Sequence, residues 1–305
     1  MSAHAWTEAD IPDQQGRVFI ITGANSGIGF EQARALAAKS ATVVLACRTP
    51  AKGEAARAAI LADHPHADIR VSAIDTADLS SVRQFAERTR QEHTRVDVLI
   101  NNAGVMAIPR QLSVDGFELQ LATNHFGHFA LTGLLLPLLN ATPGSRVVAV
   151  SSLAARRGSI HFDDLTLGDA YKPWPAYEQS KLANLVFAQE LHRRLQRVGS
   201  PIVAVAAHPG ISRTNLFSSP GDPWRKQLGA KLFGWMLQPA EFGALPVLYA
   251  ATAASVRGGD YFGPDSFFEM RGRPAPARIA AAAKDAGICR RLWEMSEQLT
   301  GVGYL

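Results

Sequence analysis

Cysteine, long apolar segments and a strong charge of either sign are all scarce in this chain. Cys47 and Cys289 are its only cysteines in 305 residues, so a disulfide framework is excluded and a reducing compartment is favoured. The longest apolar stretch, Phe129–Leu139, is too short to span a bilayer and contains Pro137. The polar segment 1–15 lacks the apolar core of a signal peptide. We therefore expect a cytoplasmic protein without a transmembrane segment.

The charge balance is modest as well. The formal net charge is +4, and the basic residues are scattered apart from short pairs such as Arg156-Arg157. A charge this small and dispersed argues against a nucleic-acid partner, but it would suit an anionic ligand such as a phosphorylated cofactor. Hydrophobic residues make up 47% of the chain and charged residues 19%, which predicts a large buried core rather than disorder.

Short β-branched runs alternate with longer segments of helical periodicity. This alternation predicts an α/β fold: a Rossmann-type, doubly wound, mostly parallel seven-stranded sheet with helices on both faces. We expect one domain over residues 1–305, with a core at 15–265, a substrate loop at 211–237 and a C-terminal helical tail at 277–305. The expected strands are Arg17–Thr22, Thr42–Ala46, Ile69–Ile74, Val96–Ile100, Arg146–Val150, Ile202–Ala206 and Asp260–Phe262. The expected helices are Gly27–Lys39, Ala51–Ala62, Leu79–His93, Gly116–Leu139, Trp174–Val198 and Ala277–Glu297.

A glycine-rich turn, Thr22–Gly29, lies between the first expected strand and a helix. Gly23 permits the tight turn, Gly27 lets the backbone approach a pyrophosphate, and Gly29 lets the helix pack on the strand. The helix N-terminus then offers free N–H groups and a positive dipole end to phosphates. This placement favours a dinucleotide site over a glycine-rich turn without a ligand.

The end of the second expected strand carries Arg48 and no acidic residue. A carboxylate at this place usually holds the 2′-hydroxyl of ribose, whereas an arginine accommodates a 2′-phosphate. Arg48, with Lys52 four residues further on, therefore favours NADP(H) over NAD(H). The alternative is that Arg48 is a solvated residue at a strand end.

Tyr177 and Lys181 stand at positions i and i+4, on one face of an expected helix. A free tyrosine has a pKa near 10 and is a poor acid–base catalyst at neutral pH unless its phenolate is stabilised. An ammonium group one turn away supplies that stabilisation. The pair alone is a weak signal. It gains weight because it follows the glycine turn and an expected strand that ends in Val150-Ser151-Ser152.

Motifs spread over residues of about 15–265 resemble, in order, those of the short-chain dehydrogenase/reductase family. Its T-G-x-x-x-G-x-G signature matches residues 22–29, and its tyrosine–lysine pair matches Tyr177 and Lys181. The remaining matches are Asn101–Gly104 (N-N-A-G), Asn124 in a helix, Ser152, and His208–Thr214, which contains P-G-x-x-x-T.

The resemblance implies a catalytic role for four residues. Tyr177 is expected to exchange a proton with the reacting oxygen, and Ser152, with Ser151 as the alternative, to hydrogen-bond that oxygen. Lys181 is expected to hold the ribose and lower the pKa of Tyr177. Asn124 is expected to anchor a water beside the lysine.

The resemblance also implies a set of NADP(H) contacts. Asp75 matches a residue that contacts adenine, although it could equally cap the helix that begins near Asp78. The expected cofactor residues are Gly23, Asn25, Ser26, Gly27, Ile28, Gly29, Arg48, Asp75, Asn102, Ala103, Gly104, Tyr177, Lys181, Pro209, Gly210 and Thr214.

Within the family, Ala46–Arg48, Asn124–His128 and Ser180–Asn184 look like the retinol dehydrogenase and WW-domain oxidoreductase branch. The implied function is hydride transfer between NADP(H) and a small-molecule carbonyl or alcohol, with a lipophilic substrate favoured by the apolar loop. A homo-oligomer is left open. The alternatives are a non-catalytic NADP(H)-binding regulatory module, which would typically lack the tyrosine or lysine, and a sugar-nucleotide epimerase or dehydratase, against which the glycine spacing argues. No metal is expected, because His125 and His128 have no third ligand nearby and should pack within their helix.

Overall fold

A sheet of buried, mostly β-branched strands forms the centre of the fold. The computed structural model describes residues 5–211 and 238–305, and these contain an eight-stranded sheet in the order β3-β2-β1-β4-β5-β6-β7-β8. β1 to β7 run parallel, and β8 is antiparallel to β7. The strands are β1 (Val18–Thr22), β2 (Thr42–Cys47), β3 (Ile69–Ala73), β4 (Val98–Asn101), β5 (Arg146–Val150), β6 (Val203–Ala207), β7 (Tyr261–Ser266) and β8 (Arg271–Pro276).

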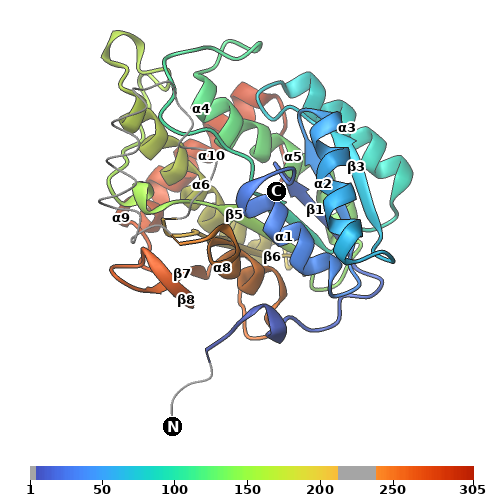
Figure 1. Cartoon of the computed structure of the whole chain (residues 1–305). Coiled ribbons are helices and arrows are strands. Elements are labelled where there is room, and N and C mark those ends of the chain that lie inside the picture. Colours follow the sequence, from blue (N-terminus) through green and yellow to red (C-terminus); the bar gives the residue numbers. More distant parts are fainter. Residues whose placement is uncertain (1–4, 212–237) are drawn as a thin grey trace, which may run out of the picture.

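Helices cover both faces of the sheet (Figure 1), as the sequence predicted. Successive side chains of a strand point to opposite faces, so Phe19 and Ile21 pack with α1, α2 and α8, whereas Ile20 packs with α3, α5 and α6. The helices are α1 (Gly27–Ala37), α2 (Pro50–Asp63), α3 (Leu79–Glu92), α4 (Leu119–Leu121), α5 (Gly127–Asn140), α6 (Pro173–Arg197), α8 (Ala240–Thr252), α9 (Ala281–Lys284) and α10 (Ala286–Thr300). Shorter turns of helix are η1 (Glu8–Asp10), η2 (Ala122–Phe126), η3 (Leu153–Arg156) and η4 (Gly168–Ala170).

The sheet in the described residues has eight strands rather than the expected seven. The additional strand, β8, reads Arg-Gly-Arg-Pro-Ala-Pro and has no β-branched residue. Its prolines are tolerated because β8 lies at the edge of the sheet, where some N–H groups need no partner. Helix α8 was also missed, because it is apolar on nearly all sides and contains Pro246, so it lacks the polar face that marks a surface helix.

Two expected helices are interrupted. The segment Gly116–Leu139 contains α4, then the π-helix η2, then α5, and it begins late because the Glu118 carboxylate caps the N–H groups of Gln120 and Leu121. The C-terminal helix is broken at Asp285, whose carboxylate accepts from Gly287 N and Ile288 N and so starts α10. Gly287, a residue with low helix propensity, lies two residues beyond the break.

No helix in the described ranges 5–211 and 238–305 is both long enough and apolar enough to cross a membrane. The expected substrate loop at 211–237 lies, apart from Ile211, outside the described residues.

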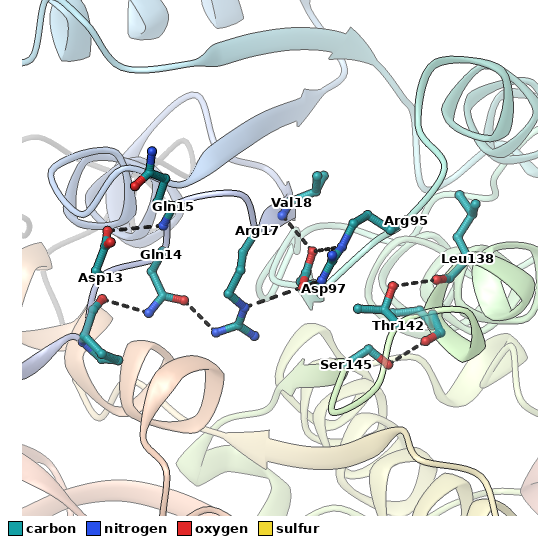
Figure 2. Close-up of polar contacts among 12 residues, drawn as sticks. Asp13, Gln14, Gln15, Arg17, Val18, Arg95, Asp97, Leu138, Thr142 and Ser145 are labelled. Atoms are coloured by element: carbon teal, nitrogen blue, oxygen red, sulfur yellow. Dashed lines mark hydrogen bonds and ion pairs between the residues drawn. The ribbon is translucent and has the colours of Figure 1, made fainter.

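Charged side chains tie strands together at the amino end of the sheet (Figure 2). Asp97, just before β4, accepts a hydrogen bond from Val18 N at 2.9 Å and one from Arg95 Nη2 at 2.5 Å. Arg17 Nε lies 3.6 Å from Asp97 Oδ1, and Arg17 Nη1 donates to Gln14 Oε1 at 2.6 Å. These contacts fix the relative positions of the first residues of β1 and β4. Because the two strands pair in parallel, they also fix the relative positions of the two carboxyl ends.

Candidate active site

A cavity of about 670 Å³ opens at the carboxyl ends of β1, β2, β4 and β5, where open parallel sheets bind ligands. Most of the expected cofactor residues line it: Gly23, Asn25, Ser26, Gly27, Ile28, Gly29, Arg48, Asp75, Asn102, Ala103, Gly104, Tyr177, Lys181 and Pro209. Lining residues that the sequence did not single out include Ala46, Ile74, Thr76, Val105, Met106, Ile108, Pro109 and Gln111. Of the other expected residues, Thr214 lies outside the described residues.

The glycine turn has the geometry that its glycines were expected to provide. Gly23 and Gly27 have φ angles of +68° and +56°, in the left-handed region that favours glycine. A Cβ on Gly29 would lie 2.6 Å from both Asn102 Nδ2 and Gly23 O, so only glycine lets α1 approach so closely. The Ser26 side chain, at the N-cap of α1, makes no capping hydrogen bond in the described structure. The first N–H groups of α1 are therefore suited to an anionic ligand.

At the far end of the cavity lie Arg48 and Asp75. Arg48 is exposed, directly after β2. The Asp75 carboxylate accepts from Ala77 N at 2.9 Å, while the N-cap of α3 is Asp78, which accepts from Ser80 N and Ser81 N. The alternative that Asp75 caps this helix is therefore wrong, and its carboxylate lies in the cavity wall.

The N-N-A-G segment connects the glycine turn to the lysine. Asn102 Nδ2 donates to Thr22 O at 2.8 Å, and Asn102 N and Ala103 N both donate to Thr22 Oγ1 at 2.9 Å. A Cβ on Gly104 would lie 3.0 Å from Asn124 Oδ1 and 3.3 Å from Lys181 Nζ. The segment thus holds β1 and β4 together and passes close to Lys181.

Tyr177 and Lys181 lie on α6 and are almost fully buried, with 7% and 4% of their surface exposed. Lys181 Nζ lies 6.0 Å from the centre of the Tyr177 ring and donates to Val150 O at 3.1 Å. Burial lowers the pKa of Lys181 to about 8. Burial also raises the pKa of Tyr177, against a hydrogen bond with Ser152 that lowers it. That Lys181 lowers the pKa of Tyr177 stays a prediction, because the direction of the shift in the free protein is set by burial of the phenol.

The two serines after β5 point to different partners. Ser151 Oγ donates to Lys181 O at 2.8 Å and is buried between β5 and α6. Ser152 interacts with Tyr177, because a hydrogen bond from its side chain lowers the pKa of the phenol, and its Oγ accepts from Ala154 N at 3.2 Å. Ser152 is therefore the serine that influences Tyr177, whereas Ser151 is the one of the two that lines the cavity.

Asn124 lies within the π-helix η2, a type of distortion that is frequent at functional sites. Its Oδ1 accepts from Val105 N at 2.8 Å, and its Nδ2 donates to Val105 O at 3.0 Å and to Ser180 Oγ at 2.8 Å. The side chain is completely buried. It is therefore held in one orientation, between the segment after Gly104 and the helix that carries Tyr177.

An ionic cluster beside Pro209 was missed by the sequence. The Glu269 carboxylate pairs with Arg156, in η3, and Glu269 Oε2 lies 2.9 Å from Nε2 of the buried His208. Glu269 belongs to the turn between β7 and β8, where Phe267, Phe268 and Glu269 have φ angles of +50°, +58° and +66°. The sequence predicted neither this turn nor β8. It therefore gave no indication that Glu269 lies near the site.

The hairpin β7–β8 also holds the P-G segment. Ile211 N donates to Met270 O at 2.7 Å, and Gln238 Nε2 donates to Pro209 O at 2.8 Å. Gly210 has a φ angle of +67°, and a Cβ there would collide with Met270 O. The position of Pro209 at the cavity thus depends on contacts with a distant part of the chain.

The chain resembles known proteins in both sequence and structure. The model of the short chain dehydrogenase family matches residues 17–222. Retinol dehydrogenase 13 of Homo sapiens is 40% identical over 300 residues, 97% of this chain and 87% of the relative. Human retinol dehydrogenase 14 is 38% identical over 304 residues, 94% of this chain and 87% of the relative. The crystal structure of an uncharacterized protein from Mycobacterium paratuberculosis has a TM-score of 0.82 and 46% identity, and the match covers 99% of both chains.

Proposed function

The chain belongs to the short-chain dehydrogenase family and is an oxidoreductase, and we propose that it transfers a hydride between NADP(H) and the carbonyl or alcohol group of a lipophilic small molecule. One observation carries the proposal. The buried Tyr177 interacts with Ser152, which lowers its pKa, and lies one helical turn from the buried Lys181, at a cavity that the glycine turn also lines. A proton donor, an oxygen-binding hydroxyl and a dinucleotide-sized groove are the parts that this reaction needs.

The residues of the cavity fit NADP(H). The glycine turn and the open N-terminus of α1 would hold the pyrophosphate, Lys181 the ribose next to the nicotinamide, and Arg48 the 2′-phosphate. When bound, the nicotinamide supplies or takes up the hydride. Arg48 at the end of β2, with no acidic residue next to it in the sequence, supports NADP(H) over NAD(H).

In the direction of reduction, Tyr177 gives its phenolic proton to the carbonyl oxygen, while Ser152 donates a hydrogen bond to that same oxygen. Burial raises the pKa of Tyr177, which keeps the group protonated but makes it a weaker acid, so the phenolate needs a stabilising partner as the proton leaves. The Lys181 ammonium stabilises the phenolate that remains. We assign to Asn124 the support of a water that returns a proton toward Lys181.

The substrate class rests on the lining of the cavity and on the relatives. Val105, Met106, Ile108 and Pro109 give the wall beyond Gly104 an apolar character. The relatives reported above are named retinol dehydrogenases. An apolar aldehyde, or the corresponding primary alcohol, is therefore the substrate class that we propose.

The test is turnover with a panel of carbonyl compounds. Purified protein is mixed with NADPH or NADH and with all-trans-retinal, medium-chain aldehydes or, as polar controls, aldoses. Loss of reduced-cofactor absorbance is expected with NADPH and the apolar aldehydes, and little loss with aldoses. Tight NADPH binding without turnover of any carbonyl would instead identify the regulatory module that the sequence left as an alternative.

A further inference from the structure

His128 joins two parts of the candidate site that lie far apart in the sequence. It is buried in the first turn of α5, with 2% of its surface exposed. Its Nε2 lies 2.9 Å from Thr22 Oγ1, at the end of β1, and its Nδ1 lies 2.9 Å from the main-chain oxygen of Asn124. The function proposed above uses the turn after Thr22 and uses Asn124, but it gives His128 no part.

The hydrogen-bond partners assign the imidazole proton to Nδ1. The Asn124 carbonyl oxygen can only accept, so Nδ1 must be the donor of that bond. At the other end, Thr22 Oγ1 accepts from Asn102 N and Ala103 N, both at 2.9 Å, which occupies its two lone pairs. Its own proton is then directed to Nε2 at 2.9 Å rather than to Ile100 O at 3.4 Å. Both hydrogen bonds of the ring therefore require the same neutral tautomer, with the proton on Nδ1.

The surroundings favour the neutral ring as well. Burial lowers the pKa of His128 to about 4, although the hydrogen bond to the Asn124 carbonyl opposes this shift. The positive charge of the nearby Lys181 contributes to this lowering of the His128 pKa. At neutral pH the ring is thus one donor and one acceptor, as its two partners require.

We propose that His128, as its Nδ1–H tautomer, is a positioning residue that holds Asn124 in register with the cofactor-binding turn. The connection runs from the N–H groups of Asn102 and Ala103 through the Thr22 hydroxyl and the imidazole to the Asn124 carbonyl. The inference rests on the proposed function for the role of Asn124, whereas the tautomer itself depends on no turnover.

His125 provides a matched control on the same stretch of helix. It is as deeply buried, with 1% of its surface exposed, but its Nε2 pairs with Ser296 Oγ of α10 at 2.9 Å. It therefore makes a comparable side-chain hydrogen bond, but to α10 rather than to the end of β1. A variant of His125 reports what the loss of a buried histidine costs in packing alone.

Two variants of His128 separate its two hydrogen bonds. The amide of His128→Gln can reach the position of Nε2 and accept from Thr22, but it removes the bond from the imidazole to the Asn124 carbonyl. We expect turnover to fall about tenfold and NADPH affinity to change less than about twofold. The amide of His128→Asn can reach the position of Nδ1, so NADPH affinity should fall about threefold while turnover stays within about twofold.

His125→Gln should lower the melting temperature and leave both constants unchanged. If both His128 variants lower turnover and NADPH affinity equally, or lower only the melting temperature as His125→Gln does, His128 is a packing residue and the proposal is wrong.

A direct measurement of the tautomer keeps the proposal testable without turnover. In ¹⁵N-histidine-labelled protein without ligand at neutral pH, the His128 signals are assigned by their loss in whichever His128 variant folds. The expected pattern is a protonated Nδ1 and an unprotonated Nε2. A protonated Nε2 would overturn the inference even if the enzyme is active, and failure of every carbonyl to react would overturn the proposed function while this measurement still decides the tautomer.

Discussion

A basic side chain lies at each end of strand β5, Arg146 from the strand itself and Lys181 from α6, and the two make different use of their donors. At the amino end, Arg146 donates from Nη1 to Ala250 O and from Nη2 to Ala253 O, each at 2.9 Å. At the carboxyl end, Lys181 donates to Val150 O at 3.1 Å, its one hydrogen-bond acceptor in the described part of the chain. Arg146 thus caps carbonyl groups at the C-terminal end of α8, whereas Lys181 has two further N–H groups, and it lines the cavity.

Burial alone does not distinguish the two groups. It lowers the pKa of Arg146 to about 10 and that of Lys181 to about 8. Arg146 Nε even lacks an acceptor among the described residues, but Arg146 does not line the cavity. The comparison teaches that a buried cation indicates function where its spare donors face a space that can hold a ligand. The predictions below separate the catalytic end of β5 from the structural end.

Lys181→Met should have the largest effect. Without the ammonium, turnover should fall at least about a hundredfold and NADPH affinity should fall as well, because one group serves both. Stability should not decrease, since a buried charge with few partners is removed. Steady-state kinetics, cofactor titration and denaturant unfolding are compared with those of Lys284→Met, an exposed lysine that does not line the cavity. Full activity of Lys181→Met would remove the basis of the comparison.

Arg146→Met should have the opposite pattern. It leaves the carbonyl oxygens of Ala250 and Ala253 without their donors, so the free energy of unfolding should fall by about 2 kcal/mol. NADPH affinity and turnover at a temperature where the variant is folded should stay within about twofold of wild type. Urea unfolding followed by tryptophan fluorescence gives the first quantity. A variant that is stable but inactive would show that the amino end of β5 also serves the reaction.

Arg48→Asp tests the cofactor assignment at the end of β2. Replacement of the cation by a carboxylate removes a charge-assisted bond to the 2′-phosphate and adds repulsion, so NADPH affinity should fall at least about tenfold. NADH affinity should rise, because the carboxylate can accept from the 2′-hydroxyl. Fluorescence titration with both cofactors measures this change. Unchanged selectivity would mean that Arg48 is a solvated residue at the strand end.

The pH dependence of NADPH binding should report Lys181. In the free protein its amine is charged below a pKa of about 8 and neutral above it, so affinity for the anionic cofactor is greatest at the lower pH. Between pH 7.5 and 8.5 the affinity should fall about threefold, the change in the charged fraction of such a group. Lys181→Met should lack this inflection, and Arg146→Met should keep it. An inflection that persists in Lys181→Met belongs to another group.

Much of the fold follows from local signals. Strands β1 to β6 and the helices between them are marked by buried β-branched runs and by helical periodicity, whose physical causes lie within a few residues. β8 and the break at Asp285 depend instead on an edge position and a side-chain cap, which only the folded context reveals. The single domain, a cytoplasmic location and a possible homo-oligomer stay predictions.

The candidate site likewise has features that follow from local sequence spacing and features that depend on the folded context. Tyr177 and Lys181 are brought together by the i, i+4 spacing of one helix, and the glycine turn by its place after β1. The pKa of Tyr177 and the hydrogen bond from Lys181 to Val150 O depend on how deeply the two side chains are buried. The spacing of the two residues in the sequence does not determine this burial. The ion pairs of Glu269 with Arg156 and His208 join residues from separate elements, and the sequence offered no pattern for them.

The central claim is hydride transfer with Tyr177 as the proton donor, and the rate of deuteride transfer tests it most directly. NADPH deuterated at the transferred position is mixed in single turnover with the best apolar aldehyde, and the alcohol formed is analysed by mass spectrometry. Wild-type protein should place deuterium on the former carbonyl carbon. Tyr177→Phe, which keeps the packing of the ring, should bind NADPH normally but transfer deuterium at least about a hundredfold more slowly. Product without deuterium, or transfer by Tyr177→Phe at nearly the wild-type rate, would contradict the account.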